Sequence, residues 1–265
     1  MRNMALNIIV CVKSVVLEAP AAALGSSVVR TPRNSVLNPF DRPALSLALE
    51  LVKEAGGFVT ALSMGSPVSR WALCEALAIG ADRAVLVSDA RAAGADTMAT
   101  SRVLAHAVNW IGSWDILLFG ARTADSDTGQ VGAQTSVFLN KPFVSMARSI
   151  TAEEGFFLIE SLADGFVEQY RAVAPLAVSV HPAAAPALDP ALASIRQAFD
   201  GNRVETISLS DMGMDPVLAG EKGSPTRVIS MTPAPKGRKC DFLEGGANEQ
   251  AQALLQKLQD AGLLF

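Results

Sequence analysis

The sequence predicts an α/β protein with a parallel sheet covered by helices on both faces, antiparallel additions to that sheet and an extended C-terminal arm. Between residues 7 and 138, short apolar runs alternate with segments of helical periodicity. Such alternation implies right-handed crossovers and a parallel sheet. Half of all residues are hydrophobic, which is enough for a sizeable core. After Pro142 the pattern changes to strand-like runs joined by Glu154–Gly155 and Asp164–Gly165 turns, which are hairpin signals.

Four strand–helix units account for the first half of the chain. The expected strands are continuous apolar runs, as in buried parallel sheets: Asn7–Val12, Phe58–Met64, Ala84–Val87 and Ile116–Phe119. The expected helices are Arg42–Glu54, a segment after Pro67 that contains Trp71 and Leu77, a segment from Thr97 to Ile111, and Val131–Phe138. The loop Ser14–Leu37 is long, which in a compact domain is typical of a functional or interface-forming segment.

Shorter elements follow Pro142. We expect antiparallel strands at Phe143–Ile150, Gly155–Ser161, Phe166–Val173 and Leu176–Val180, then a short helix Ala191–Phe199 and a strand Val204–Leu209. The segment 211–244 is rich in Gly, Pro and Lys and is expected to be extended, and Asn248–Ala261 has apolar residues at helical spacing. This pattern predicts an α/β domain at residues 1–220 and an arm with a terminal helix at 221–265. The arm would pack on a partner subunit or, alternatively, on its own domain.

Composition excludes several classes of function. The net charge of −4 and the pI near 5.3 argue against nucleic acid or an anionic membrane surface as a partner. No apolar run approaches the roughly 20 residues of a membrane span. Cys11, Cys74 and Cys240 share no short spacing, which fits a reducing cytoplasm and disfavours a disulfide framework or a metal site. With only His106 and His181 as histidines, acid–base chemistry has few candidates, which favours a carrier or binding subunit over a hydrolase.

The stretch Gly120–Phe138 is the strongest candidate for a ligand site. A buried strand, a polar Gly-rich turn and a helix start place backbone N–H groups where they can face an anion. Ser126 and Thr128 are expected to cap the helix, while Gly129 and Gly132 allow a ligand to approach the backbone. Neither a P-loop nor a GxGxxG fingerprint is present. The alternative is an ordinary strand-to-helix turn with a good cap.

Other strand ends are expected to complete this site. Ligands of parallel sheets bind at the carboxyl ends of the strands, so Cys11, Met64 and the residues from Gly120 onward would line one crevice. Asn38 precedes a proline and is biased to an extended conformation, from which its amide would reach a ligand. The alternative for the sequence Asn-Pro-Phe-Asp at 38–41 is a helix N-cap with a packed phenylalanine.

The order of motifs resembles the beta subunit of electron transfer flavoprotein, the FixA family. The similarity covers nearly the whole chain, in order, and is therefore more specific than any single motif. The motifs are VCVKS at 10–14, NPFDRPAL at 38–45, EALAIGADRAVLVSD at 75–89, AGADTMATSRVLA at 93–105, ADSDTGQVG at 124–132, DGFVEQYRAVAPLAVSV at 164–180 and SPTRVISMTPAP at 224–235.

This resemblance implies an adenine nucleotide alpha hydrolase-like or Rossmann-like fold in an obligate heterodimer. The alpha subunit would hold most of one FAD, and this chain would bury a structural AMP. Thr128, Gly129, Gln130 and Gly132 would take the phosphate, Cys11, Met64 and Phe40 would surround the adenine, and Asp41 or Asp127 would accept ribose hydroxyls. The family's AMP contacts fall on Cys11, Asn38, Pro39, Phe40, Asp41, Met64, Asp127, Thr128, Gly129, Gln130, Val131, Gly132, Ala133, Gln134, Thr135, Ser136, Val137 and Phe138.

The resemblance also implies partners. Electrons would come from an acyl-CoA or related dehydrogenase and pass to an electron transfer flavoprotein–quinone oxidoreductase in the membrane. Leu192, with Ile195, would dock the dehydrogenase, although Ala187–Asp189 replace the family's arginine and aromatic residue. Glu168 would hold the flavin domain of the alpha subunit; the alternative is an ordinary strand-surface carboxylate.

Three other functions remain open at this point. Within the family, an electron-bifurcating subunit would bind a second FAD in place of AMP and oxidise NADH. Val15–Leu17 stand where the family has Val-Pro-Asp, and this difference, with Phe40, favours AMP. Outside the family, a stand-alone nucleotide-binding regulator would need no partner subunit. An ATP-using enzyme would need a cation poised for transfer, and Arg122 is the only cation in the phosphate stretch.

Overall fold

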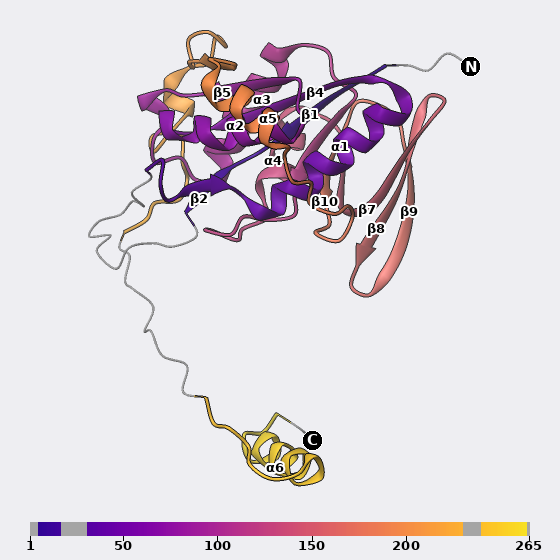
Figure 1. The fold of residues 1–265 in the computed structure, drawn as a ribbon. Coiled ribbons are helices and arrows are strands. Elements are labelled where there is room, and N and C mark those ends of the chain that lie inside the picture. Colours follow the sequence, from indigo (N-terminus) through magenta and orange to yellow (C-terminus); the bar gives the residue numbers. More distant parts are fainter. Residues whose placement is uncertain (1–4, 17–30, 230–239, 264–265) are drawn as a thin grey trace. The chain divides into compact units, whose positions relative to one another are not determined.

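The computed structural model describes residues 5–16, 31–229 and 240–263 (Figure 1). The chain divides into two compact units, Met1–Met231 and Thr232–Phe265. The loop expected at Ser14–Leu37 is described only at its ends, where β2 (Ser14–Val16) and β3 (Ser35–Leu37) pair antiparallel. Among the described helices, none is long and apolar enough to cross a membrane.

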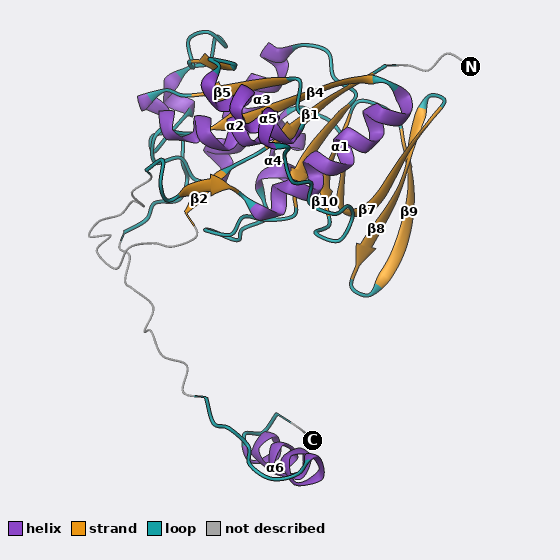
Figure 2. Cartoon of the chain, viewed as in Figure 1, coloured by secondary structure: helices purple, strands orange, loops and turns teal. Residues whose placement is uncertain are grey.

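A nine-stranded sheet forms the centre of the first unit (Figure 2). Its order is β11-β5-β4-β1-β6-β10-β7-β8-β9, and every pairing is parallel except β7–β8 and β8–β9. The strands are β1 (Leu6–Cys11), β4 (Gly57–Met64), β5 (Arg83–Val87), β6 (Ile116–Gly120), β7 (Phe143–Glu153), β8 (Phe156–Ala163), β9 (Phe166–Ala172), β10 (Leu176–Val180) and β11 (Val204–Ile207).

Helices cover both faces of this sheet, as the alternation of strands and helices predicts. In β1, Ile8 and Val10 join the core on one face, while Ile9 and Cys11 join the core on the other. The first core includes residues of α1 (Arg42–Ala55), α2 (Arg70–Ile79) and α5 (Leu192–Asp200). The second includes residues of α3 (Thr97–Ile111), against which α4 (Val131–Phe138) packs. A strand buried on both faces has no polar side, which explains the continuous apolar runs.

The prediction of antiparallel strands after Pro142 holds for the pairings of β7 with β8 and of β8 with β9, and it is wrong for β10. β10 lies between β6 and β7 and is parallel to both. All five of its residues are buried, as in the strands of the first half of the chain. β9 is the exposed edge of the sheet. The apolar run identifies a buried strand, but its neighbours come from distant parts of the sequence.

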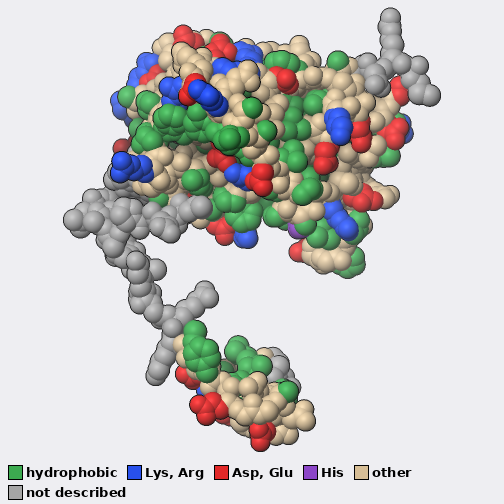
Figure 3. Space-filling view, in the orientation of Figure 1, with side chains coloured by type: hydrophobic (Ala, Val, Ile, Leu, Met, Phe, Trp, Pro, Cys, Tyr) green, Lys and Arg blue, Asp and Glu red, His purple; other side chains and the backbone are tan. Residues whose placement is uncertain are grey.

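The second unit contains one described helix, α6 (Ala247–Asp260). The Gly246 N–H donates to Glu249 Oε2 at 2.8 Å at its start, and Lys257 pairs with Asp241 at 2.8 Å. Leu254 and Leu255 are each about half exposed, and apolar side chains show on the surface of this unit (Figure 3). The amphipathic helix expected here is therefore present, with part of its apolar face unburied.

Candidate functional site

A pocket lies at the carboxyl ends of the central strands. Cys11 ends β1, Met64 ends β4 and Gly120 ends β6, and all three line the pocket. Residues 128–132, which close the turn after β6 and begin α4, form another wall. This is the edge at which open α/β sheets bind their ligands. The other lining residues are Val12, Lys13, Asp41, Leu104, Phe119, Arg122 and Thr123.

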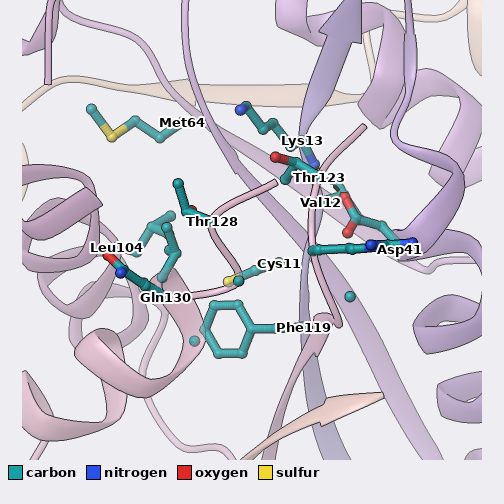
Figure 4. A pocket seen from close by; sticks show the side chains of 15 residues that line it. Cys11, Val12, Lys13, Asp41, Met64, Leu104, Phe119, Thr123, Thr128 and Gln130 are labelled. Atoms are coloured by element: carbon teal, nitrogen blue, oxygen red, sulfur yellow. Dashed lines mark hydrogen bonds between the residues drawn. The ribbon is translucent and has the colours of Figure 1, made fainter. Parts of the chain in front are cut away.

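Apolar and polar side chains both line the pocket (Figure 4). Cys11 and Phe119 lie side by side and form an apolar edge, and both belong to the core on that face of the sheet. Lys13 and Thr123 lie at the opposite edge. An apolar wall with a few convergent polar groups is the usual construction of a small-molecule site.

The turn after β6 is packed tightly against the segment 38–41. A Cβ atom on Gly120 would lie 2.2 Å from the Asp41 carboxylate and 2.5 Å from the Phe40 carbonyl oxygen, so only glycine fits. Further along, Asp127 and Gly129 both have positive φ, at 52° and 61°. Residues 128–130, on either side of this left-handed position at Gly129, line the pocket together with the strand ends.

Asn38 ties these two segments together. Its side chain is fully buried; Nδ2 donates to Asp41 Oδ1 at 2.8 Å and to the Arg122 carbonyl at 2.9 Å, and Oδ1 accepts from the Ala124 N–H at 3.1 Å. The amide expected to face a ligand is thus bonded within the protein, and Asn38 does not line the pocket. Asn38 positions the turn that does line it.

Asp41 is a buried carboxyl at the floor of the site. Oδ2 accepts from the Lys13 N–H at 2.7 Å, and Oδ1 accepts from Asn38. Burial raises the pKa of Asp41 to about 7, against these hydrogen bonds, which lower it. Burial, with the nearby Asp41 charge, also raises the pKa of the Cys11 thiol far above its usual range. Cys11 therefore stays a protonated, unreactive thiol and serves as an apolar wall.

Lys13 and Arg122 are the cations of the site, and the analysis of the sequence did not include either among the site residues. The Lys13 ammonium lies 2.7 Å from Asp125 Oδ1 and 3.3 Å from Ser126 Oγ. The Arg122 guanidinium lies 3.5 Å from Asp127 Oδ1 and stacks over the Phe40 ring at 4.6 Å. Lys13 could have been found by the same rule as Cys11, because both stand at the end of β1.

The expected cap of α4 is absent. The N-cap residue is Gln130, and it makes no side-chain cap hydrogen bond. The Ser126 hydroxyl, expected as a cap, is instead bonded to Thr123 Oγ1 at 2.9 Å and to Lys13. Thr128 lies on the pocket wall. First-turn N–H groups without a side-chain cap are suited to an anionic ligand.

Several residues expected at the site lie outside the pocket lining. Gly132 does line it, but its missing Cβ faces the rings of Phe119 and Phe143 at 3.1 Å, so close packing requires this glycine as well. In α4, Thr135 and Ser136 donate to carbonyls of their own helix. The expected residues outside the lining are Asn38, Pro39, Phe40, Asp127, Ala133, Gln134, Thr135, Ser136, Val137 and Phe138.

Comparison with known proteins gives the family. Residues 26–212 match the Electron transfer flavoprotein domain. The chain belongs to the electron transfer flavoprotein family. An electron transfer flavoprotein subunit beta of Thermoanaerobacterium thermosaccharolyticum is 32% identical over 256 residues, which cover 96% of this chain and 98% of the relative. Protein FixA of Azorhizobium caulinodans is 31% identical over 266 residues, covering 96% and 94%.

A third relative of this electron transfer flavoprotein chain is named for a larger complex. The caffeyl-CoA reductase-Etf complex subunit CarD of Acetobacterium woodii is 31% identical over 265 residues, which cover 98% of this chain and all of that protein. The resemblance to the beta-subunit (FixA) family is therefore confirmed, and so is the α/β fold with antiparallel additions. As a member of this family, the protein is an electron transfer subunit.

The residues expected to dock partners of the flavoprotein lie on other elements. Leu192 is 83% exposed at the start of α5, and Ile195 packs partly against the core. Both line a shallow groove with Arg196, Gln197 and Asp200. Glu168 lies on the edge strand β9, where it accepts a hydrogen bond from the Tyr170 hydroxyl. Their roles in docking stay predictions.

Proposed function

We propose that this chain is the beta subunit of a heterodimeric electron transfer flavoprotein, and that its pocket binds a structural AMP. The alpha subunit holds most of the FAD, which supplies the electron transfer chemistry when bound. The complex takes electrons from an acyl-CoA or related dehydrogenase and delivers them to a membrane quinone oxidoreductase. In this scheme the chain is a carrier subunit, and none of its own residues is catalytic.

The observation that carries the proposal is the two-sided pocket at the carboxyl ends of β1, β4 and β6. The uncapped start of α4 and the backbone at Gly129 would receive a phosphate, since amide N–H groups there favour an anion. The apolar edge at Cys11 and Phe119 suits an adenine ring. Asp41 already accepts two hydrogen bonds from the protein, so it serves the ribose less well than an unengaged carboxylate would.

Release of the bound nucleotide tests the AMP assignment. We expect the purified chain, with any subunit that co-purifies, to release one AMP per chain on denaturation, identified by chromatography and mass spectrometry. A flavin-containing second chain should co-purify. A preparation that holds no adenine nucleotide, and that binds none added to it, would end this proposal.

A bifurcating subunit is the second candidate. The name of the relative CarD, a subunit of a caffeyl-CoA reductase-Etf complex, favours this candidate. A second FAD would place its own AMP portion in the same pocket, so the phosphate turn does not distinguish the two ligands. Visible absorbance of the pure heterodimer does: one flavin per heterodimer supports AMP, and two flavins with NADH-dependent reduction support the second candidate.

A further inference from the structure

We propose that Asp125 is an internal substitute for the ligand phosphate, and that Lys13 exchanges this carboxylate for the phosphate when the nucleotide binds. The inference rests on the proposed function, because it concerns the phosphate end of the same pocket. It assigns Lys13 as a phosphate-binding residue and Asp125 as a competing anion. Neither role follows from the backbone turn alone.

The Lys13–Asp125 pair has the geometry that such an exchange needs. Lys13 lines the pocket, and its ammonium lies 2.7 Å from Asp125 Oδ1 and 3.3 Å from the Ser126 hydroxyl. The Lys13 side chain is 36% exposed and that of Asp125 is 13% exposed. A lysine on a four-carbon stem, partly open to solvent, can turn from one anion to another without backbone movement.

The backbone around Lys13 is fixed, so only the side chain is left to move. The Lys13 N–H is bonded to Asp41, and the Lys13 carbonyl accepts from the Asn38 N–H at 2.9 Å. Asn38 in turn holds the turn that carries Asp125, through Arg122 and Ala124. One hydrogen-bond network therefore fixes the backbone on both sides of the Lys13–Asp125 pair. Lys13 lines the pocket, whereas Asp125 is not among the lining residues, so an anion bound in the pocket would meet the ammonium rather than the carboxylate.

The other cation–carboxylate pair of the site is weaker. Arg122 and Asp127 are 3.5 Å apart, with side chains 51% and 62% exposed. Exposed pairs at such distances contribute little, because solvent screens them. Arg122 is also held over the Phe40 ring. Competition for the phosphate should therefore come chiefly from Asp125, and Asp127 offers a comparison that removes the same charge from the same turn.

The test compares AMP with adenosine, which lacks the phosphate, on the purified chain together with its co-purifying subunit. Labelled adenosine is displaced by unlabelled AMP or adenosine at equilibrium.

We expect Asp125→Asn to tighten AMP binding by about threefold to tenfold, because a charge-assisted competitor is removed. Lys13→Gln should weaken AMP binding by about tenfold, and Asp127→Asn should give a gain of less than about twofold. Adenosine affinity should stay unchanged in Asp125→Asn and Lys13→Gln, which also shows that the pocket has folded. Because Asp127 is a candidate ribose contact, its variant is judged by the ratio of AMP affinity to adenosine affinity, which should change by less than about twofold.

The double variant isolates the exchange. Once Lys13→Gln has removed the cation, Asp125→Asn should give a smaller gain in AMP affinity than it gives in the wild type, because the part of its effect that acts through Lys13 is lost. AMP affinity that is equal in wild type, Lys13→Gln and Asp125→Asn would overturn the inference while leaving the proposed function intact. Weaker AMP binding in Asp125→Asn would also overturn it, because Asp125 would then hold Lys13 in place rather than compete. Failure of both AMP and adenosine to bind the wild type would instead overturn the proposed function.

Discussion

At the residue scale, buried polar side chains fix the shape of the pocket together with the glycines of the turn. Asn38 and Asp41 connect the end of β1 to the turn after β6. Asp41 accepts from the Lys13 N–H and from the Asn38 amide, the Asn38 amide also donates to the Arg122 carbonyl and accepts from the Ala124 N–H, and the Asn38 N–H donates to the Lys13 carbonyl. Each polar group is paired, as buried groups must be. The Asn-Pro-Phe-Asp sequence therefore holds the turn that lines the pocket. Burial raises the pKa of its Asp41 carboxyl to about 7, so the charge of this group changes near neutral pH.

Asp41 should make the stability of the protein fall as the pH rises. Its pKa is about 7 in the folded chain and near the usual value of about 3.9 when unfolded, so the folded state binds more protons between those values. The free energy of unfolding then decreases with pH across this window, by at most about 1.4 kcal/mol per pH unit. Asp41→Asn should remove this pH dependence. Any other change that it makes in the free energy of unfolding is the same at each pH.

Urea unfolding of both proteins at pH 5 and pH 7.5 measures this effect. Between pH 5 and pH 7.5, the urea midpoint of the wild type should fall relative to that of Asp41→Asn. Identical pH dependence in the two proteins would show that Asp41 does not titrate in this range.

A site residue could be predicted from the sequence where a local sequence pattern indicates its position. Cys11 and Met64 follow from the strand-end rule, and Gly129 and Gly132 from the glycine content of the turn. Asn38 is predicted to face a ligand, but its amide is bonded within the protein, to partners that lie more than 80 residues away or within its own turn, so its orientation depends on the tertiary fold. Lys13 follows the end of β1, so the strand-end rule could have included it, whereas its ion pair with Asp125, 112 residues away, depends on the tertiary fold.

Strand order is the main feature that local patterns could not give at the element scale. The apolar run of β10 predicts a buried strand, which is correct, whereas its parallel position between β6 and β7 depends on chain segments far apart in sequence. The β8–β9 hairpin was predicted because its turn signals are local. Helix ends follow the same division: α3 is capped by Asp96 in its own sequence, while α4 has no such cap.

Asp96 joins α3 to the segment that leaves the first unit. Its Oδ1 accepts from the Ala99 N–H at 2.9 Å, and its Oδ2 accepts from the Thr226 N–H at 3.0 Å and hydroxyl at 2.8 Å. We expect Asp96→Ala to lower stability by about 1–2 kcal/mol through loss of the cap, and to speed amide exchange at Thr226.

Thr226→Val is the matched control for this prediction. It removes only the hydroxyl contact and keeps the cap of α3, so its thermal midpoint should fall by less than half as much as that of Asp96→Ala. Equal losses in the two variants would show that the tie to Thr226, and not the cap, is what stabilises this region. Thermal unfolding and hydrogen exchange of the full chain provide the two readouts.

On the scale of the whole molecule, the second unit carries exposed apolar side chains that a partner subunit would cover. In Thr232–Phe265, α6 keeps Leu254 and Leu255 about half exposed, and no residue of this helix is buried among those described. Apolar side chains left in solvent on an amphipathic helix are typical of an interaction surface. Ser224, by contrast, is buried in the first unit, where it accepts from the Asp96 N–H at 2.8 Å.

A truncation that tests the role of the second unit should therefore remove the chain from Thr232 onward. This truncation keeps Ser224 and Thr226 in place. We expect the chain ending at Met231 to retain its nucleotide and its thermal midpoint, because the pocket and both cores lie in the first unit. Its association with the flavin-containing subunit, measured by sedimentation or co-purification, should weaken by at least about tenfold, as for loss of a main anchor.

Leu254→Asp with Leu255→Asp in the full-length chain should have the same effect, because the two charges oppose burial of the α6 face. The exposed Gln250→Asp change, outside that pair, serves as the control for added charge on the same helix. Association that is undiminished in both the truncated chain and the Leu254/Leu255 variant would show that the partner binds the first unit alone.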